Sequence, residues 1–401
     1  MVRSQNGSAP RARTRIMMIT AAELTADPRA RRAAEEAARR GLDVQGLCVS
    51  DLQELPGIAV KRVSGPAFER RIRELGVMRV GRSSRVAREI RGIYRLGRHA
   101  LITSRYVRAV RGLEPCEIVH ANDFDTLPAA AIVARRWGAR LIYDSHELYT
   151  FQEPDPPRLY CLLVRAVEGR LARRSDALIT VNPSYAEKLT ALFRLRQAPF
   201  LVMNCPPLEA VSPASPPADG RLRVVYQAAM GPGRRVEDLV EAAVHTGDSH
   251  ITIRVVGADR KALRRLIDKL GVEERVTIAD PAPPDTLVQA LAPFDVGVVI
   301  NRPVTANDEF VLPNKLFEYM MASLAVVTPD LPLIGRFVAR ERVGVTFSPG
   351  DSAAMGHAIQ RLADDRELLR DSRERARKLA VETYNAESQA SELARAWGIA
   401  P

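Results

Sequence analysis

Residues 205–220 read CPPLEAVSPASPPADG, and this stretch divides the chain into two parts. Proline fixes φ and removes a backbone donor, so a segment rich in Pro, Ser and Ala supports neither a strand ladder nor a helix. We therefore expect a linker here. The chain has 401 residues, which exceeds the usual size of one domain, so a central linker predicts two cores of somewhat under two hundred residues each.

On both sides of this segment, short apolar runs alternate with longer amphipathic stretches, as in parallel strands covered by helices. Before it we expect strands at 15–20, 43–49, 117–120, 140–144 and 177–182, and helices at 28–40, 84–113 and 159–173. After it we expect strands at 222–227, 251–256, 276–279, 296–300, 325–328 and 343–347. The pattern predicts an α/β protein with two Rossmann-like, doubly wound domains that face a central cleft.

The expected domain limits follow from these elements. Residues 14–205 would form the N-terminal domain, 206–220 the linker, 221–384 the C-terminal domain and 385–400 a terminal helix.

The composition is that of an ordinary folded protein, with 46% hydrophobic and 27% charged residues. Its net charge of +11 is concentrated in residues 61–111, where arginine recurs every three or four positions. Such a patch suits an anionic membrane, a phosphorylated acceptor or simply a solvated helix face. Nucleic acid is disfavoured as a partner, because no stacking aromatics or known nucleic-acid motifs accompany the arginines.

The four cysteines, at positions 48, 116, 161 and 205, lie far apart and form no CxxC pattern, so neither a metal site nor a disulfide framework is expected. The first fourteen residues contain no apolar leader core, and no run reaches the roughly 18 apolar residues of a membrane span. We expect a cytoplasmic protein, with peripheral contact at the inner membrane face as an open alternative.

The segment LPNKLFEYMMASLAVVTP, residues 312–329, carries the most specific site signal. A loop with Pro313 leads into a short helix whose first backbone N–H groups favour an anion, and Lys315 adds a full positive charge. A diphosphate is therefore expected there. Glu318 lies one turn further along and can accept two hydrogen bonds from a ribose diol.

A second segment, VVYQAAMGPGRRVEDLVEAA, covers residues 224–243. A buried strand is expected to turn through Gly231 and Gly233 into a helix, with Arg234 and Arg235 at the helix start. The guanidinium group presents a fork of donors that suits phosphate oxygens. We expect both arginines to bind the same diphosphate as Lys315.

In the first half, EIVHANDFDTLPAA and RLIYDSHELYTFQEP place polar residues directly after apolar strands, at the cleft edge of the sheet. The candidates are His120, Asp123, His146 and Glu147. For His120 and Asp123 a loop-fixing hydrogen bond is an equally good interpretation. The DFD motif at 123–125 looks like a metal-binding DxD, but a basic phosphate site would make a metal redundant, so we expect none.

These segments resemble the retaining glycosyltransferase family four, of GT-B fold, in its PNKLFEYM-type branch. Glu318 matches the second of the two glutamates that the family places eight positions apart, and Arg234 stands in the place of its phosphate-binding lysine. His146 matches a histidine that lies near the transferring sugar. The closing segment YNAESQASELARAW resembles the family's terminal helix, which crosses back to the first domain.

The chain also departs from the family pattern. Phe310 occupies the place of the first glutamate, which leaves Asn307, Asp308 or Glu309 as substitutes. Ala228 and Ala229 stand where a glycine and often an arginine are found. Near the N-terminus, the DPR sequence looks like a variant of the same branch in which Asp27 and Arg29 line the acceptor side; a helix cap is an equally good interpretation.

The resemblance implies retaining transfer of a sugar from a nucleoside diphosphate sugar, UDP- or GDP-linked, to a small-molecule or lipid-linked acceptor, with no further cofactor. The implied catalytic residues are His146, Arg234 and Lys315, the donor-binding residues Glu318, Asn314, Arg235, Gly233 and Glu309, and the acceptor-side residues His120, Asp123, Glu147 and Asp27. Two alternatives stay open: a nucleotide-sugar 2-epimerase of similar fold and a non-catalytic nucleotide-sugar binder.

Overall fold

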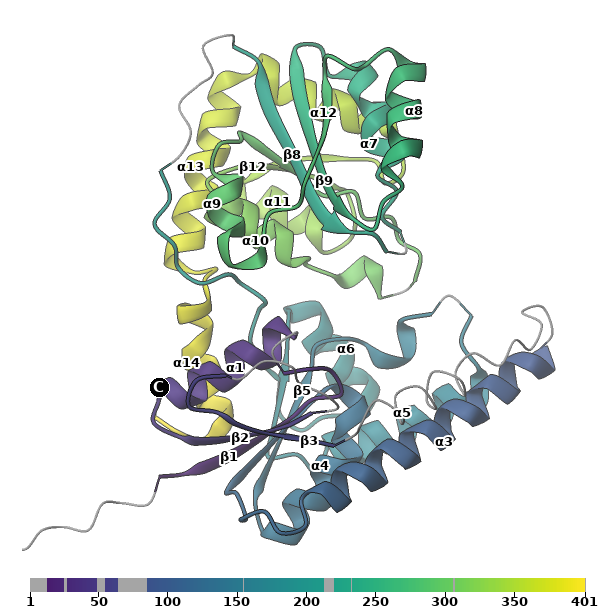
Figure 1. Cartoon of the computed structure of the whole chain (residues 1–401), viewed down its shortest axis with the longest axis vertical. Helices are drawn as coiled ribbons and strands as arrows, with labels where there is room; N and C mark the ends of the chain where they lie inside the picture. The colour runs from purple at the N-terminus through teal and green to yellow at the C-terminus, as the bar shows by residue number, and fades with distance from the viewer. Residues whose placement is uncertain are drawn as a thin grey trace, which may run out of the picture.

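The computed structural model describes residues 13–24, 27–48, 55–63, 85–153, 155–212, 220–231, 233–305 and 307–400. They form two domains, one above the other in Figure 1, each built on a parallel sheet. Parts of two predicted features, residues 213–219 of the linker and 64–84 of the basic stretch, lie outside the described residues.

The first sheet has seven strands in the order β3-β2-β1-β4-β5-β6-β7. They are β1 (Arg15–Ile19), β2 (Asp43–Cys48), β3 (Ala59–Arg62), β4 (Ile118–Asn122), β5 (Arg140–Ser145), β6 (Ala177–Thr180) and β7 (Phe200–Leu201). The two edge strands, β3 and β7, were not predicted. Edge strands are paired on one side only, and here β3 is mostly exposed while β7 has two residues, so neither produces a recognisable apolar run.

The second sheet has six strands in the order β10-β9-β8-β11-β12-β13. They are β8 (Leu222–Ala229), β9 (Ser249–Val256), β10 (Val276–Ala279), β11 (Val296–Val298), β12 (Ala325–Pro329) and β13 (Gly344–Phe347). In each sheet the strand order reverses beside the first strand, between β1 and β4 and between β8 and β11. This doubly wound topology confirms the predicted fold class and places a switch point at the carboxyl ends of those strands.

Helices cover both faces of the first sheet. The elements of this domain are α1 (Pro28–Arg39), α3 (Arg85–Ala109), α4 (Asp123–Trp137), η1 (Tyr149–Phe151), α5 (Arg158–Ala172) and α6 (Pro183–Phe193). Alternate residues of β1 point to opposite faces: Met17 packs with Tyr106 of α3, whereas Met18 packs with α1. This period of two is that of a strand buried on both sides.

The second domain is covered in the same way. Its helices are α7 (Glu237–Ala242), η2 (Ala243–His245), α8 (Arg260–Leu270), η3 (Pro284–Thr286), α9 (Leu287–Leu291), η4 (Asp308–Phe310), α10 (Asn314–Met321), α11 (Ile334–Glu341), α12 (Ser352–Asp364) and α13 (Arg366–Glu382). Each sheet face has its own apolar core. None of the described helices is long and apolar enough to cross a membrane.

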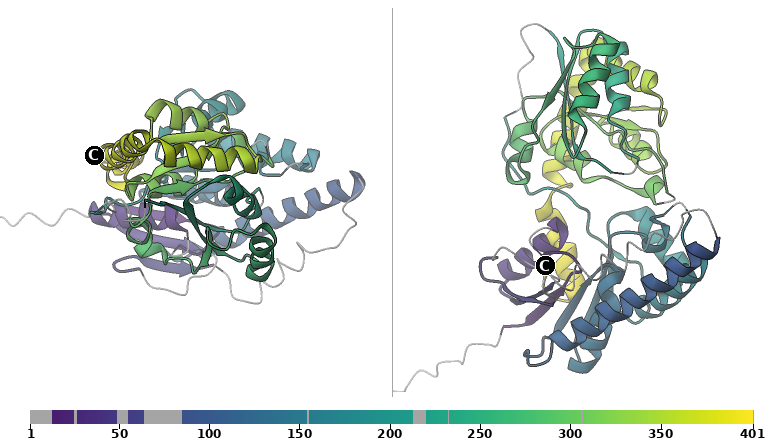
Figure 2. Two further views of the ribbon diagram at one scale, coloured as in Figure 1. Left: turned by 90° about the horizontal axis from the view of Figure 1, so that it is seen from above. Right: turned by 45° about the vertical axis from the view of Figure 1, so that its right-hand side comes forward.

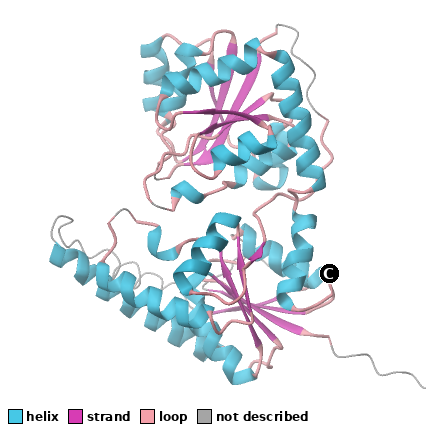
Figure 3. Ribbon diagram, turned by 180° about the vertical axis from the view of Figure 1, so that it is seen from behind, coloured by secondary structure: helices cyan, strands magenta, loops and turns pink. Residues whose placement is uncertain are grey.

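The chain passes between the domains twice. It leaves β7 through an extended segment, in which Cys205 packs into the core of the second domain. It returns at the end of α13 through Asn385, which caps the final helix α14 (Ala386–Trp397). Trp397 is fully buried against the first sheet, so α14 belongs to the first domain's core (Figures 2 and 3).

Candidate active site

A cleft of about 580 Å³ separates the two domains. Its wall contains residues that follow β5 and β6 in the first domain, residues that follow β8 and β11 in the second, and the start of α10. The polar lining residues include His146, Glu147, Asn182, Tyr185, Arg234, Asn301, Asn307, Asn314, Lys315 and Glu318. The cleft therefore brings together polar residues from the segments that the sequence singled out in both halves.

Helix α10 begins in the cleft. Pro313 precedes it in an extended conformation and supplies no side-chain acceptor, so the first N–H groups have no side-chain cap. Asn314 and Lys315 occupy its first turn, and Glu318 follows one turn later. The uncapped helix start, one lysine and one carboxylate are the arrangement expected for a diphosphate followed by a ribose.

Lys315 is buried, and its ammonium group has no hydrogen-bond partner among the described residues. The nitrogen lies 4.6 Å from the centre of the Tyr226 ring, which gives the charge a cation–π contact. Burial, together with the nearby charge of Arg234, lowers the pKa of Lys315 to about 7. An anion bound in the cleft would favour the protonated form of Lys315, so this site suits a negatively charged ligand.

The Glu318 carboxylate is the second charged group of α10. It lies near Lys315 and Arg32 but accepts no hydrogen bond from the described residues, and burial raises its pKa. A carboxylate without a partner at the cleft wall is available to a diol. The geometry is compatible with the predicted ribose contact.

Arg234 reaches the cleft from the loop before α7. Its backbone forms an antiparallel bridge with Asn301, and its guanidinium donates to the Ala229 carbonyl at 3.2 Å. One neutral hydrogen bond leaves most of the guanidinium fork without a partner among the described residues. Arg234 and Lys315 thus place two cationic side chains on the second domain's side of the cleft.

Two residues of the same loop that were predicted to bind the donor do not line the cleft. Arg235 does not line the cleft: its side chain is 54% exposed and lies 3.2 Å from Asp238, within the acidic first turn of α7. Opposite charges at a helix start explain this orientation. Gly233 does not line the cleft either. Its φ is +71°, and a Cβ at this position would lie 2.6 Å from the Arg302 carbonyl oxygen, so the glycine allows a close backbone approach.

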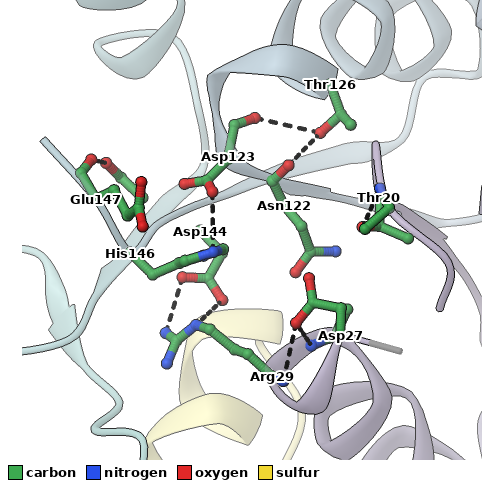
Figure 4. Close-up of polar contacts among 12 residues, drawn as sticks. Thr20, Asp27, Arg29, Asn122, Asp123, Thr126, Asp144, His146 and Glu147 are labelled. Atoms are coloured by element: carbon green, nitrogen blue, oxygen red, sulfur yellow. Dashed lines mark hydrogen bonds and ion pairs between the residues drawn. The ribbon is translucent and has the colours of Figure 1, made fainter. Parts of the chain in front are cut away.

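His146 and Asp123 form a pair on the first domain's side (Figure 4). The His146 Nε2 atom lies 2.9 Å from a carboxylate oxygen of Asp123. Burial opposes the charged imidazolium, but Asp123 outweighs it and raises the pKa of His146 to about 9. The second ring nitrogen, Nδ1, is buried without a partner among the described residues, so a charged His146 can donate a hydrogen bond from it.

Asp123, which was predicted on the acceptor side, does not itself line the cleft. It starts α4 with a φ of +58°, a conformation that Asp tolerates better than most residues. Such a backbone is maintained only where the surroundings fix it. Here it directs the carboxylate toward His146, so Asp123 orients a cleft residue.

Glu147 follows His146 and lines the cleft. Burial and the charge of Asp123 raise its pKa to about 7, against the opposing effect of His146. Near neutral pH, Glu147 therefore exchanges a proton easily, as a general acid or base requires.

The two acids of the DFD motif have different partners. Asp123 pairs with His146, whereas Asp125 accepts a hydrogen bond from Tyr149 at 3.0 Å and lies 3.2 Å from His99. Asp125 thus connects α3, α4 and η1.

His120 and Asp27 do not lie in the cleft, contrary to prediction. His120 is fully buried and accepts a hydrogen bond from the Trp397 indole at 3.0 Å. Asp27 caps α1, accepting from two backbone N–H groups. In both cases the alternative interpretation, a structural hydrogen bond, describes the observed contacts.

Arg29 is also buried rather than on the acceptor side. Its guanidinium forms two hydrogen bonds with Asp144, at 2.7 and 2.8 Å, and two more with the Val202 carbonyl and the Asn204 side chain. Figure 4 shows the pairing of Arg29 with Asp144. Because His120, which binds Trp397, lies 3.7 Å from Asp144, one buried network joins β5, α1, α14 and the segment that leads to the second domain. The network supports the strand end that carries His146.

A loop of the second domain contacts the first. The Asn307 side-chain oxygen accepts from the Tyr185 hydroxyl at 2.6 Å and from the Leu148 N–H at 3.3 Å. Asn182 donates to the Phe310 carbonyl at 2.9 Å, and the Phe310 ring packs on the first domain's core under Lys188. Phe310 is therefore an interdomain contact.

Of the three residues that could substitute for the missing glutamate, Asn307 alone lines the cleft. The Asp308 carboxylate binds the backbone of Val304 and Thr305, and Glu309 lies outside the wall, so the donor-binding prediction for Glu309 is not met here.

Asn182 and Tyr185 were not predicted as site residues. Asn182 lies two residues after the end of β6 and caps α6, so the rule that identified His146 could also have identified it. Tyr185 carries no sequence signal, because an aromatic residue in an amphipathic helix is typical of a core position.

Comparison with known proteins agrees with this geometry. Residues 25–205 match the family described as glycosyl transferase 4-like domain, and residues 221–365 match glycosyl transferases group 1. The two matches together cover most of the chain, and the boundary between them falls in the linker that joins the two domains. The two family matches identify a two-domain glycosyltransferase, and its two facing parallel sheets are those of the GT-B class. The first half of the chain belongs to the glycosyl transferase 4-like domains and the second half to the glycosyl transferases group 1.

Solved structures share the fold over nearly the full length. Sucrose-phosphate synthase from Thermosynechococcus elongatus has a TM-score of 0.70 and 16% identity, covering 96% of this chain and 98% of that one. HepE from Anabaena, in complex with UDP and glucose, has a TM-score of 0.67 and 15% identity over 96% and 99%. A glycosyltransferase from Rickettsia africae has a TM-score of 0.69 and 10% identity over 96% and 98%. No curated protein matches the chain.

Proposed function

We propose that this glycosyltransferase is a retaining enzyme that moves a sugar from a nucleoside diphosphate sugar to an acceptor hydroxyl. One observation carries the proposal: Arg234, Lys315 and Glu318 of the second domain face His146 of the first across a single cleft. The similar Anabaena structure contains UDP and glucose, which favours a donor of this class. UDP and GDP donors are both compatible with the proposal.

On the donor side, Arg234 and Lys315 would bind the diphosphate, without a further cofactor, and Glu318 would accept hydrogen bonds from the ribose diol. Asn314 lies at the exposed start of α10, next to the expected diphosphate. Removing a charged phosphate partner in a partly closed site typically costs about 2 to 5 kcal/mol. In this proposal residues 221–384 form the donor domain, 14–205 the acceptor domain, 206–220 the linker and 385–400 the returning helix.

In the reaction, the bond between the sugar's anomeric carbon and the phosphate oxygen breaks, and a bond to the acceptor oxygen forms on the same face. The acceptor proton moves to the departing phosphate oxygen. Arg234 and Lys315 stabilise the negative charge that develops there. His146, held by Asp123, would donate from Nδ1 to a hydroxyl of the sugar and keep it oriented.

A nucleotide-sugar 2-epimerase is the second candidate, and one observation favours it. Such an enzyme needs acid and base groups around the sugar, and Glu147 has a pKa of about 7 beside His146. Glycosyl transfer is the better-supported proposal, because both halves of the chain match glycosyltransferase families.

Incubating the protein with UDP- and GDP-sugars, with and without a panel of acceptors, separates the candidates. Nucleotide release that depends on an acceptor, with retained configuration in the product, supports the proposal. Isomerised donor without transfer would indicate the epimerase, and binding without turnover would indicate a nucleotide-sugar binder. The acceptor panel should include lipid-linked and small-molecule hydroxyl compounds, the two classes that we propose.

We also propose a cytoplasmic location, which the four free, buried cysteines favour, with peripheral contact at the inner membrane face.

A further inference from the structure

Exposed apolar side chains gather on two neighbouring helices of the first domain, α3 and α5. About half of the exposed large apolar residues in the described part of the chain lie there. On α5, Leu162 is 66% exposed, and Leu159 and Val167 are exposed beside it. On α3, Val86, Ile90 and Ile93 are exposed. Soluble surfaces rarely gather such residues without a partner.

The spacing of these residues forms stripes. Val86, Ile90 and Ile93 are separated by four and three positions, and so lie on one side of α3. On α5, Leu159 and Val167 lie two turns apart and define a similar stripe. The two helices pack side by side along the outside of the first domain (Figures 1 and 2).

Close packing brings the two helix starts together. The Glu89 carboxylate of α3 accepts hydrogen bonds from the N–H groups of Arg158 and Leu159 at the start of α5. Gly92 leaves no room for a side chain, since a Cβ there would lie 2.8 Å from Pro157. The helix segments that carry the two stripes are therefore next to each other, and we call the two stripes together the α3–α5 face.

The exposed charged residues of α3 and α5 that lack an ion-pair partner within the described residues are all positive. Arg98 and Arg108 of α3 and Arg158 and Arg170 of α5 are exposed and form no ion pair within the described residues. Each helix has one acidic residue. Glu89 binds backbone N–H groups of α5 and acts on Arg88 and Arg158, whereas Glu168 is buried against the Tyr143 hydroxyl. At the rim, Glu153 and Asp155 pair with other arginines of α3.

We propose that the α3–α5 face docks on the surface of an anionic lipid bilayer. Aliphatic side chains at helical spacing enter the boundary between headgroups and acyl chains, while arginines bind the lipid phosphates. A nucleic acid would use the arginines but offer nothing to the leucine and isoleucine side chains. The docking would be peripheral and would not require a membrane-spanning segment.

Side-chain contacts join α3 to the segment that follows β5 on the first domain's side of the cleft. Arg95 of α3 pairs with Glu153, just after η1, and His99 of α3 lies 3.4 Å from the Tyr149 hydroxyl. Tyr149 belongs to the segment that begins with His146. If the proposed glycosyl transfer is correct, an acceptor anchored in the same bilayer would be presented to the first domain. This second step rests on the proposed glycosyl transfer, whereas the docking does not.

The test is sedimentation of the full chain with vesicles at low and high salt. Two compositions are compared: phosphatidylcholine alone, and phosphatidylcholine with phosphatidylglycerol. We expect binding to the anionic vesicles only, weakened by salt. The variant Ile90→Ser with Ile93→Ser should reduce the bound fraction roughly tenfold, and Arg98→Glu with Arg170→Glu should reduce it by at least as much. Free glycerol phosphate should not displace the protein.

Matched controls lie on the second domain. Val244→Ser with Val381→Ser removes exposed apolar side chains there, and Arg264→Glu with Arg265→Glu reverses exposed charges; both should bind vesicles like the wild type. The proposal is overturned if the wild type ignores anionic vesicles, or if the face variants bind as well as the controls do. It is also overturned if sedimentation velocity shows that the face joins two copies of the chain.

Melting curves of each variant verify that it is folded. Donor binding measured in parallel keeps the outcome of the vesicle test separate from the glycosyltransferase proposal.

Discussion

Lys315 should take up a proton when the donor binds above neutral pH. Its pKa is about 7 because the ammonium group is buried beside Arg234 without a hydrogen-bond partner among the described residues. At pH 8, only about one molecule in ten therefore carries the charge. A bound diphosphate supplies the missing negative partner and returns the pKa toward its ordinary value of 10.5.

The size of the effect follows from this difference. Between pH 6 and pH 8 the dissociation constant of a nucleoside diphosphate sugar should rise about tenfold, or about 1.4 kcal/mol, because protonating Lys315 becomes part of binding. The direction of the pH dependence follows from the lowered pKa of Lys315 in the free protein. Donor affinity is highest below about pH 7, where Lys315 is already protonated, and decreases above it. An intact nucleotide-sugar is the right ligand, since its diphosphate does not titrate in this range.

Isothermal titration calorimetry in buffers of different ionisation enthalpy measures both the dissociation constant and the number of protons taken up on binding. We expect an uptake of about 0.9 proton at pH 8 and little at pH 6. Lys315→Met should bind more weakly at pH 6 and lose the pH dependence. If the dependence survives in Lys315→Met, Glu147 or His146 causes it and the reasoning about Lys315 is refuted.

Four further predictions follow from the contacts. Arg234→Ala should weaken donor binding by about 2 to 5 kcal/mol at every pH, whereas Arg235→Ala, its exposed neighbour, should change it little; titration calorimetry measures both. Asp123→Asn removes the charge that raises the pKa of His146, so any step in the pH profile of kcat near pH 9 should move to lower pH. Tyr185→Phe removes a 2.6 Å bond between the domains and should increase KM about fivefold, for about 1 kcal/mol, as initial rates would show. Arg29→Met leaves Asp144 buried without its cation and should destabilise the protein by about 3 to 5 kcal/mol, seen as a lower Tm; an unchanged Tm would mean that the buried network carries little energy.

The elements that the sequence predicted well are those with a strong period. Central strands such as β1 and β12 are continuous apolar runs, and α1 has both an Asp cap and a Pro at its first position. Local patterns of this kind specify an element without reference to the rest of the chain. Strand β3 was not predicted because no local pattern specifies it. It is held by pairing with β2, and most of its side chains are exposed.

The site was predicted where it depends on strand ends and missed where it depends on distant contacts. His146 and Glu147 follow β5 and line the cleft, as the rule for parallel sheets anticipates. A structural hydrogen bond was one of the two interpretations of His120, but its partner could not be foreseen, because Trp397 lies 277 residues away. Arg235 was assigned to the diphosphate from its position in the loop, but the acids of α7 turn it outward.

The most direct test of the central claim is a titration of the wild type and Glu318→Ala with UDP- and GDP-sugars. We expect the wild type to bind at least one of them, and Glu318→Ala to bind it at least tenfold more weakly while remaining folded, because the ribose loses its carboxylate partner. Equal affinity in the two proteins, or no binding of any nucleotide-sugar by the wild type, would contradict the assignment of this cleft as a donor site.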